Sequence, residues 1–298
     1  MSRMKTLIIG GEGYIGSFLF NYLNRLDFAV YRYGNRSHDY NKLTSAELNQ
    51  YNYIIVLAGN SSVPSCNGDL KPAWNNNVRN FSNLIEKLSN KVKVIYASSS
   101  SVYGDCKNKV FKETDFRISS YLNNYDLTKI MLDQVALNYI LDGHNIVGLR
   151  LGTVNGAGPV IRKELLINSM TYSALTNKKI YITNADINRP FLSINDLAIT
   201  MLSILTSNFV PGIYNLATGN NQIKQYAEAV SALTNAEIID NGNTPGVYDF
   251  MINSDKIIDQ YNFECCDSLE NVITGLITAY NNSNTKLVAR TEYFNYTG

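Results

Sequence analysis

Short apolar runs alternate with amphipathic segments along the first half of the chain. Runs at 5–10, 28–31, 53–58, 92–97 and 145–150 are typical of buried parallel strands. Between them, the apolar side chains are spaced as on one face of a helix, over 14–26, 77–88 and 125–140. This alternation predicts an α/β fold with a doubly wound parallel sheet and right-handed crossovers.

After Arg150 the pattern is less regular. Several glycines interrupt it, and it predicts a helix over 163–176 and short strands near Ile180 and Ile213. We expect a smaller C-terminal region that packs over the carboxyl edge of the sheet, where ligands of such sheets bind.

Composition and charge exclude several classes of function. A chain of 298 residues with 45% apolar content can bury one large core or two modest ones. Its net charge of +1 gives no reason to expect nucleic acid or an anionic membrane as a partner. With no long apolar run and an N-terminus that leads directly into a strand, we expect a cytoplasmic protein. The four cysteines and two histidines lack metal-ligand spacing, so we expect no metal site.

A glycine turn joins the first strand to the first helix. Gly10, Gly13 and Gly16 recur every third residue, with Tyr14 and Ile15 between the last two. Such a turn brings the backbone close to a pyrophosphate, which the N-terminus of the following helix stabilises. We assign these five residues to a dinucleotide site; the alternative is a glycine-rich turn without a ligand.

The end of the second strand bears on the choice of dinucleotide. An acidic residue about 20 positions after the turn would bind the ribose hydroxyls of NAD. Here Gly34, Asn35 and Arg36 occupy that region, and no carboxylate follows until Asp39. Gly34 leaves room for a 2′-phosphate that Arg36 can bind bidentately, so we favour NADP(H). In the alternative, Arg36 is a solvated charge and Asp39 binds NAD(H).

Tyr125 and Lys129 share one face of a predicted helix, because four residues separate them. A nearby ammonium lowers the pKa of a phenol and makes it a usable proton donor or acceptor. The spacing occurs by chance in many helices. The upstream glycine turn and the serine run 98–101, which follows a strand, favour a catalytic role.

The ordered motifs identify a family. The chain resembles the extended short-chain dehydrogenase/reductases of the NAD-dependent epimerase/dehydratase family, which act on nucleotide sugars. The resemblance covers about residues 5–280 and rests on Gly10-Gly-x-Gly-Tyr-Ile-Gly16, Leu57-Ala-Gly59, Asn76-Asn-Val78, Ala97-Ser-Ser-Ser-Ser-Val-Tyr-Gly104, Tyr125-x-x-x-Lys129, Leu149-Arg-Leu-Gly-Thr-Val-x-Gly156, Arg189-Pro-Phe-Leu-x-Ile-x-Asp-Leu-Ala198 and Gly212-Ile-Tyr-Asn-Leu-Ala217.

The resemblance implies a domain organisation and an assembly. A Rossmann-like dinucleotide-binding domain would span 1–152, with some later segments returning to it, and a substrate-binding region would span 153–285. The stretch 286–298 stays unassigned. Family members also suggest a homodimer.

The resemblance also implies roles for single residues. Tyr125 would be the catalytic acid or base, Lys129 would hold the nicotinamide ribose and lower the Tyr125 pKa, and Ser99 would hydrogen-bond the reacting sugar oxygen. The remaining cofactor contacts would come from Leu57, Ala58, Gly59 and Asn77, and the substrate contacts from Ser99, Ser100, Thr153, Asn168 and Arg189. Three of these have structural alternatives: Ser99 as a strand-end hydroxyl, Asn77 as an organiser of the backbone, and Arg189 as an anchor for its strand.

Departures from the family pattern reduce the number of reactions that we expect of this chain. Dehydratases of the family carry an Asp-Glu pair after the catalytic hydroxyl, where this chain has Ser100 and Ser101, so we do not expect dehydration. Many epimerases have asparagine in place of Thr153. The arginine that clamps the substrate diphosphate is absent near 245–249, where Arg162 or Arg189 could compensate.

Reduction of a 4-keto-6-deoxy nucleotide sugar is therefore the leading hypothesis. A 4-epimerase with a tightly bound dinucleotide uses the same residues and is the alternative. A non-catalytic dinucleotide-binding protein is a third, since the fold alone does not fix the function.

Overall fold

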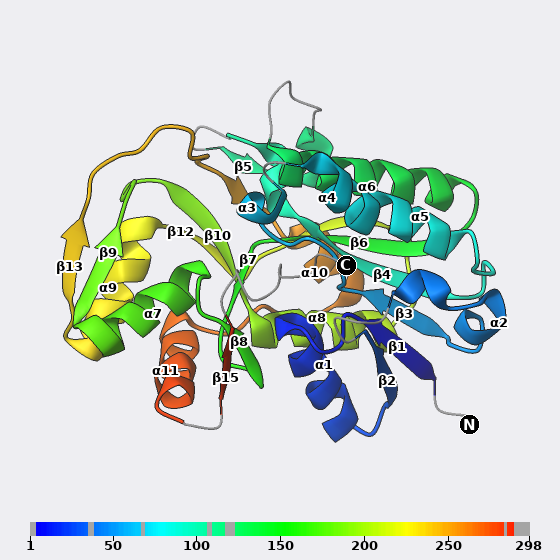
Figure 1. Ribbon diagram of the computed structural model, residues 1–298, viewed down its shortest axis with the longest axis horizontal. Coiled ribbons are helices and arrows are strands. Elements are labelled where there is room, and N and C mark those ends of the chain that lie inside the picture. Colours follow the sequence, from blue (N-terminus) through cyan, green and yellow to red (C-terminus); the bar gives the residue numbers. More distant parts are fainter. Residues whose placement is uncertain are drawn as a thin grey trace.

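The computed structural model describes residues 4–34, 39–66, 69–105, 109–116, 123–282 and 285–288. Its largest element is a six-stranded parallel sheet in the order β11-β6-β4-β3-β1-β2 (Figure 1). The strands are β1 (Lys5–Ile9), β2 (Ala29–Tyr33), β3 (Tyr53–Val56), β4 (Lys93–Ser99), β6 (Asn145–Leu151) and β11 (Gly212–Leu216). The predicted α/β class with a doubly wound parallel sheet is confirmed.

The strand order reverses between β1 and β3. From β1 the chain crosses to β2 on one side, and the later strands β3, β4 and β6 continue on the other side. The crossovers diverge at this point and leave a crevice at the carboxyl ends of the strands, where ligands of such sheets bind. Gly10 follows β1 here, and the N–H groups of Leu57 and Ala58 after β3 both donate to the Ile9 carbonyl.

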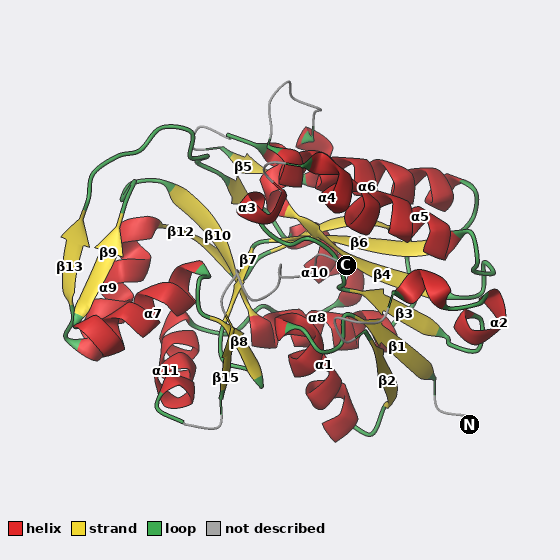
Figure 2. Cartoon of the chain, viewed as in Figure 1, coloured by secondary structure: helices red, strands yellow, loops and turns green. Residues whose placement is uncertain are grey.

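Helices cover both faces of the sheet (Figure 2). On one face, α1 (Tyr14–Arg25), α8 (Ile194–Thr206) and α10 (Asp255–Tyr261) pack Leu19, Leu23, Met201 and Ile257 against the strands. On the other face, α5 (Asn80–Ile85) and α6 (Asn124–Leu141) do so with Phe81, Leu84 and Leu132. The short elements on that side are α2 (Ser45–Leu48), α3 (Val63–Cys66), α4 (Leu70–Trp74) and the 3₁₀ turn η1 (Tyr40–Lys42).

Two predicted elements differ from the observed ones. The second strand begins at Ala29, because the Phe28 N–H donates to Leu23 and closes the end of α1. The helix expected over 77–88 starts earlier, as a π-helical turn η2 (Asn75–Arg79), and α5 ends at Ile85. Such turns interrupt helices frequently at functional sites.

A second group of helices lies away from α5 and α6, at the left of Figure 1. It comprises α7 (Leu166–Asn177), α9 (Ile223–Thr234) and α11 (Leu269–Tyr280), which bury Ile167, Tyr226 and Ile273 in a core of their own. Smaller sheets are also present. One has three strands, with β10 (Asn188–Ser193) between β12 (Gly219–Gln222) and β7 (Thr153–Asn155). The others are pairs: β9 (Lys179–Ile182) with β13 (Glu237–Asp240); β8 (Val160–Arg162) with β15 (Lys286–Val288); and β5 (Val110–Phe111) with β14 (Met251–Ile252).

One later segment of the chain joins the main sheet. β11 lies parallel to β6, with Tyr214 opposite Leu149. At the other end of the chain, β15 takes up the first residues of the unassigned stretch 286–298, while 289–298 lie outside the described residues. The division into two domains at residue 152 remains a prediction.

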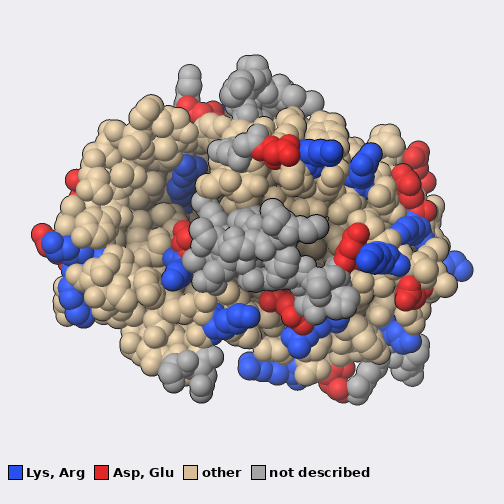
Figure 3. All heavy atoms as spheres, in the orientation of Figure 1, with Lys and Arg blue, Asp and Glu red and all other residues tan. Residues whose placement is uncertain are grey.

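Lysine, arginine and acidic side chains are interspersed over the visible part of the face drawn in Figure 3, without a block of one sign. This distribution agrees with the net charge of +1. In the described part of the chain, no helix combines the length and apolar character needed to cross a membrane.

Candidate active site

A serine cluster forms where β4 ends. Ser99 is the last residue of β4 and caps the 3₁₀ turn η3 (Ser100–Tyr103). Its Oγ accepts from the Ser101 N–H at 3.2 Å and lies 2.8 Å from Ser101 Oγ. Ser100 is buried and donates to the Leu151 carbonyl at 2.9 Å, away from this cluster. That hydroxyl joins the start of η3 to the end of β6, and the substrate contact of Ser100 stays a prediction.

Tyr125 lies in the first turn of α6, with its phenol close to the Ser99 side chain. The structure thus brings together two residues that the family resemblance assigns to one oxygen. Burial raises the pKa of Tyr125 to about 12, although the nearby Ser99 side chain and the charge of Arg162 oppose the shift. The phenol consequently keeps its proton at neutral pH.

Lys129 points from the next turn of α6 toward the sheet. Its Nζ donates to the Ala97 carbonyl at 2.8 Å and lies 5.9 Å from the centre of the Tyr125 ring. Burial lowers the pKa of Lys129 to about 8, against the opposing charge of Asp133. The expected lowering of the Tyr125 pKa by Lys129 is not found, because burial of the phenol outweighs the charges around it.

A buried ion pair, which the motifs did not predict, lies behind Lys129. Asp133, fully buried on α6, accepts from Arg150 Nε at 2.8 Å and from the Tyr96 hydroxyl at 2.8 Å. Arg150 also donates to the Tyr103 hydroxyl at 2.9 Å. The signal for this pair is an arginine inside an apolar strand, since a buried charge requires a buried partner.

The glycine turn is tightly packed at Gly10 and Gly16 and more open at Gly13. A Cβ at Gly10 would lie 2.7 Å from Ala58 N, and one at Gly16 would lie 2.2 Å from the Gly10 carbonyl oxygen, so packing within the protein explains both glycines. At Gly13 the nearest atom to such a Cβ is 3.4 Å away, and no side chain caps α1 at this residue. The start of α1 thus offers uncapped N–H groups with space beside them, which fits the diphosphate of a dinucleotide.

The other two residues of the turn face the protein. The Tyr14 hydroxyl donates to the Gly156 carbonyl at 2.8 Å, and Ile15 packs against the core below the sheet. Their side chains are therefore committed to packing, and any contact with a cofactor would come from their backbone.

The end of β2 carries a cation that the motifs did not single out. Arg32 stacks on Phe20 with 4.8 Å between its guanidinium carbon and the ring centre, and its Nε lies 4.0 Å from Glu12 in the glycine turn. Asp39, the alternative ribose ligand, caps η1 by accepting from the Asn41 N–H at 2.9 Å. Asn35 and Arg36 lie outside the described residues.

Asn77 fixes the loop that follows β3. Its Oδ1 accepts from the Asn60 N–H at 2.7 Å, and its Nδ2 donates to Thr128 Oγ1 on α6 at 2.9 Å. A Cβ at Gly59 would lie 2.5 Å from Asn77 Oδ1, which explains the glycine there. The geometry shows Asn77 as an organiser of the backbone around Leu57–Gly59, next to the crevice.

Among the residues expected to bind substrate, Asn168 hydrogen-bonds within the protein. It is fully buried, accepts from the Gly156 N–H at 3.0 Å and donates to the Arg162 carbonyl at 3.0 Å. Its contact with a substrate diphosphate stays a prediction. Thr153, in β7, keeps a partly exposed side chain.

Two arginines were expected to replace the missing clamp. Arg162 donates to Glu164 at 2.9 Å and to Ser61 at 2.9 Å, so its charge is balanced. The guanidinium carbon of Arg189, in β10, lies 4.9 Å from the centre of the Phe250 ring. Burial lowers the pKa of Arg189, and the charges of Asp249 and Asp126 oppose this shift. Both arginines thus lie near carboxylates, and the geometry favours neither as a replacement for the missing clamp.

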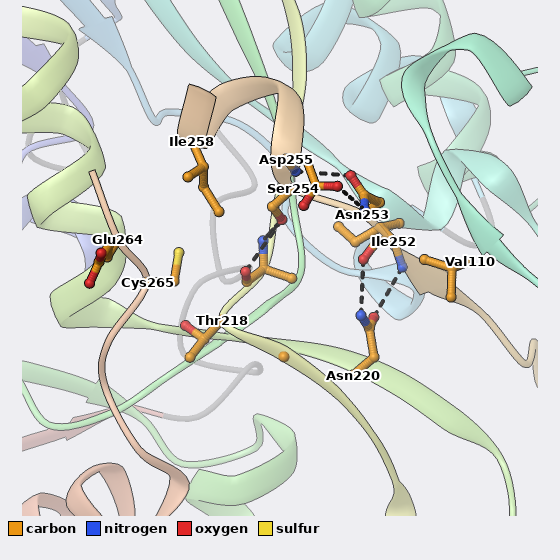
Figure 4. A pocket seen from close by; sticks show the side chains of 12 residues that line it. Val110, Thr218, Asn220, Ile252, Asn253, Ser254, Asp255, Ile258, Glu264 and Cys265 are labelled. Atoms are coloured by element: carbon orange, nitrogen blue, oxygen red, sulfur yellow. Dashed lines mark hydrogen bonds between the residues drawn. The ribbon is translucent and has the colours of Figure 1, made fainter. Parts of the chain in front are cut away.

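A cavity of about 440 Å³ lies beside this site, between β12, β14 and α10 (Figure 4). The walls satisfy their own polar groups: Asn220 exchanges hydrogen bonds with the Ile252 backbone, and Ser254 does so with Ala217. Ser99, Tyr125 and Lys129 do not line it. The cavity is therefore separate from these three candidate residues.

The curated proteins that this chain resembles include a reductase and an uncharacterised protein. The chain is 23% identical over 196 residues to a GDP-6-deoxy-D-mannose reductase of Pseudomonas aeruginosa, which covers 62% of this chain and 64% of the reductase. An uncharacterised protein of Methanocaldococcus jannaschii is 33% identical over 132 residues, or 44% of this chain and 39% of that protein. The chain thus matches less than two thirds of the length of these curated relatives.

Solved structures match over nearly the whole chain. RMD from Pseudomonas aeruginosa, complexed with NADPH, has a TM-score of 0.77 at 18% identity, with 92% and 97% of the two chains covered. The NAD-dependent hexosamine 5,6-dehydratase TunA gives 0.82 at 19%, covering 93% and 97%. A UDP-N-acetylglucosamine 4-epimerase of Methanobrevibacter ruminantium gives 0.82 at 20%, covering 93% and 99%. At such identities the likeness shows the fold.

The family follows from the sequence match. A family model described as the NAD dependent epimerase/dehydratase family matches residues 6–217, which include the glycine turn, the serine cluster and the Tyr125 helix. The chain therefore belongs to the NAD dependent epimerase/dehydratase family.

Proposed function

We propose that this protein is an NADP(H)-dependent reductase that converts the keto group of a 4-keto-6-deoxy nucleotide sugar to a hydroxyl. The observation that carries the proposal is the place of Tyr125, in the first turn of α6 and close to Ser99, which ends β4 at the carboxyl edge of the sheet. A reductase needs a proton donor at this place, because the oxygen of the substrate gains negative charge as the hydride arrives.

In this reaction, residues of the chain would supply the proton, a hydrogen bond to the substrate oxygen and a positive charge, and the dinucleotide would supply the hydride. A nicotinamide dinucleotide, when bound at the glycine turn, provides the hydride that adds to the keto carbon. Tyr125 donates its proton to the developing alkoxide, and the Ser99 hydroxyl donates a hydrogen bond to the same oxygen. Lys129, held by the Ala97 carbonyl, brings a positive charge to the ribose side of the site.

Reduction and the first step of epimerisation use Tyr125 in opposite directions. A 4-epimerase first oxidises its substrate, so the phenol must accept the hydroxyl proton, whereas a reductase uses the phenol as a proton donor. Burial raises the pKa of Tyr125, which supports the donor role.

The end of β2 supports NADP(H). Gly34 leaves space, and no carboxylate between Gly34 and Asp39 repels a 2′-phosphate. Arg32 and Arg36 are the nearby cations, and Arg32 lies next to the glycine turn, where a Cβ at Gly11 would meet Arg32 Cβ at 2.4 Å. The space that Gly11 leaves allows this approach.

The oxidation of NADPH and of NADH across a panel of nucleotide-linked 4-keto sugars tests the proposal. We expect consumption of NADPH with at least one 4-keto-6-deoxy sugar, and a loss of 100-fold or more in kcat for Tyr125→Phe, the order typical for loss of a general acid. The matched control is Tyr181→Phe, since Tyr181 is exposed on β9.

Three outcomes contradict the proposal. If neither coenzyme is oxidised with any sugar, the protein is not a reductase. Wild-type rates in Tyr125→Phe would rule out the proton donor. A dinucleotide that copurifies in stoichiometric amount, with interconversion of 4-epimers and no net NADPH consumption, would establish the epimerase instead.

A further inference from the structure

Asp126, the residue after Tyr125, is a buried carboxyl that the mechanism above does not use. It is fully buried in the first turn of α6. One oxygen accepts from the Ser101 hydroxyl at 2.5 Å, and the other accepts from Asn123 Nδ2 at 2.7 Å. The sequence places serines where a dehydratase has acids, yet the fold brings a carboxyl to Ser101 from another element.

Ser99, Ser101 and Asp126 form a continuous line of hydrogen bonds. Ser101 has a single hydroxyl proton and donates it to Asp126, so the Ser99 hydroxyl is the donor in the 2.8 Å contact with Ser101. Tyr125 lies close to Ser99, at the other end of this line. The line therefore runs from the side chain beside the phenol to the carboxylate, and each serine hydroxyl points toward Asp126.

The surroundings of Asp126 make its protonation sensitive to pH. The titratable and charged groups that act on it are Arg189 from β10, Tyr248 from the segment before β14, Tyr125 on the same helix, and Cys66 at the end of α3. Burial raises the pKa of Asp126 to about 6, and the charge of Arg189 and the hydrogen bonds from Ser101 and Asn123 only partly offset it.

We propose that Asp126 is a positioning residue that sets, through Ser101, whether the Ser99 hydroxyl can donate to the substrate. When Asp126 is ionised, it draws the Ser101 proton, Ser101 accepts from Ser99, and the Ser99 proton points away from the substrate. When Asp126 is protonated, it donates to Ser101, Ser101 donates to Ser99, and the Ser99 proton is free for the substrate oxygen. Only this second arrangement provides both donors that the reaction uses.

This inference rests on the proposed reductase, and it predicts a pH dependence that the reductase alone does not. For the wild-type enzyme, kcat should fall about tenfold as the pH rises from 5 to 8, because one donor to the alkoxide is lost. Asp126→Asn should keep the shape of the site, since its amide nitrogen donates to Ser101 and its oxygen still accepts from Asn123. The variant fixes the line in the donating direction.

The experiment is the pH profile of kcat for wild type, Asp126→Asn, Ser101→Ala and Ser101→Thr. We expect the Asp126→Asn profile to be flat from pH 5 to 8, so that this variant exceeds wild type about tenfold at pH 8. Ser101→Ala should also remove the pH dependence, and Ser101→Thr, which keeps the hydroxyl, should restore it. Asp186→Asn is the control, because Asp186 is exposed and pairs with Lys224.

A purely structural role predicts something else. In that case Asp126→Asn would lose activity at every pH and keep the slope of wild type, and this result would overturn the inference. A readout without substrate separates it from the proposed function: the carboxyl ¹³C resonance of Asp126, assigned with Asp126→Asn, should titrate near pH 6 and move to higher pH in Ser101→Ala. Titration near pH 4 would overturn the inference even in an active reductase.

Discussion

Arg150 Nε lies 2.8 Å from Asp133 Oδ2, and both side chains are almost completely buried. The pair joins β6 to α6 directly behind Lys129, and Tyr96 and Tyr103 supply its remaining hydrogen bonds. The position of α6 against the sheet thus depends on a buried charge pair as well as on apolar packing.

Removal of one partner should destabilise the protein strongly. In Arg150→Ala, Asp133 is left buried without a countercharge, and we expect the free energy of unfolding to fall by about 3–5 kcal/mol. Urea denaturation measures this change. Lys224→Ala, which breaks the exposed pair with Asp186, should cost less than about 1 kcal/mol. Equal effects of the two variants would contradict the importance of the buried pair.

Two glycines of the turn should separate folding from dinucleotide binding. Gly16→Ala places a Cβ 2.2 Å from the Gly10 carbonyl oxygen, so the turn must distort, and we expect a lower melting temperature. Gly13→Ala meets only an ordinary contact at 3.4 Å, so the protein should fold normally. Its added methyl group occupies the approach to α1, and the Kd for NADPH should rise tenfold or more, about 1.4 kcal/mol. Calorimetry and thermal melts of both variants test this, and unchanged NADPH affinity in Gly13→Ala would place the diphosphate elsewhere.

The charge of Lys129 should limit activity on the alkaline side. Burial lowers the pKa of Lys129 to about 8, so the ammonium is present below that pH and is lost above it. We expect NADPH affinity to fall as the pH rises through 8. Arginine keeps its charge throughout this range, so Lys129→Arg should lack the decline. A decline that persists unchanged in this variant would point to another group.

Asp126 should make the protein less stable as the pH rises. Its carboxyl has a pKa of about 6 in the folded protein against an ordinary value of 3.8, so the folded state favours the protonated form. The contribution to stability is complete below pH 3.8 and is lost as the pH rises through 6, by at most about 3 kcal/mol. Urea denaturation between pH 4 and 8 should show this loss in wild type and a smaller one in Asp126→Asn. Equal slopes would contradict the raised pKa.

The main sheet was predictable because most of its strands are nearly continuous apolar runs, which are typical of strands buried on both faces of a parallel sheet. The π-helical turn at Asn75–Arg79 was not, since the apolar spacing that follows it is that of an ordinary helix. Ser99, Tyr125 and the glycine turn could be placed from their motifs.

The partners of Ser101 and Asp133 come from elements distant in sequence. Asp126 reaches Ser101 across 25 positions, and Asp133 meets Arg150 across 17. No local pattern contains such pairs. The directions of the pKa shifts also depend on burial, which the sequence does not show. At Tyr125, burial raises the pKa, whereas the neighbouring Lys129 was expected to lower it.

The place of β11 in the sheet has a consequence for the order in which the protein forms. β6 pairs with β4 on one side and with β11 on the other, and β11 begins only at Gly212. When the first 152 residues have emerged from the ribosome, β11 has not yet been made. One edge of β6 then carries unpaired N–H and C=O groups, which can pair with a strand of another chain. A fragment that ends at 152 should therefore aggregate, and the nascent sheet stays incomplete until some sixty further residues have emerged.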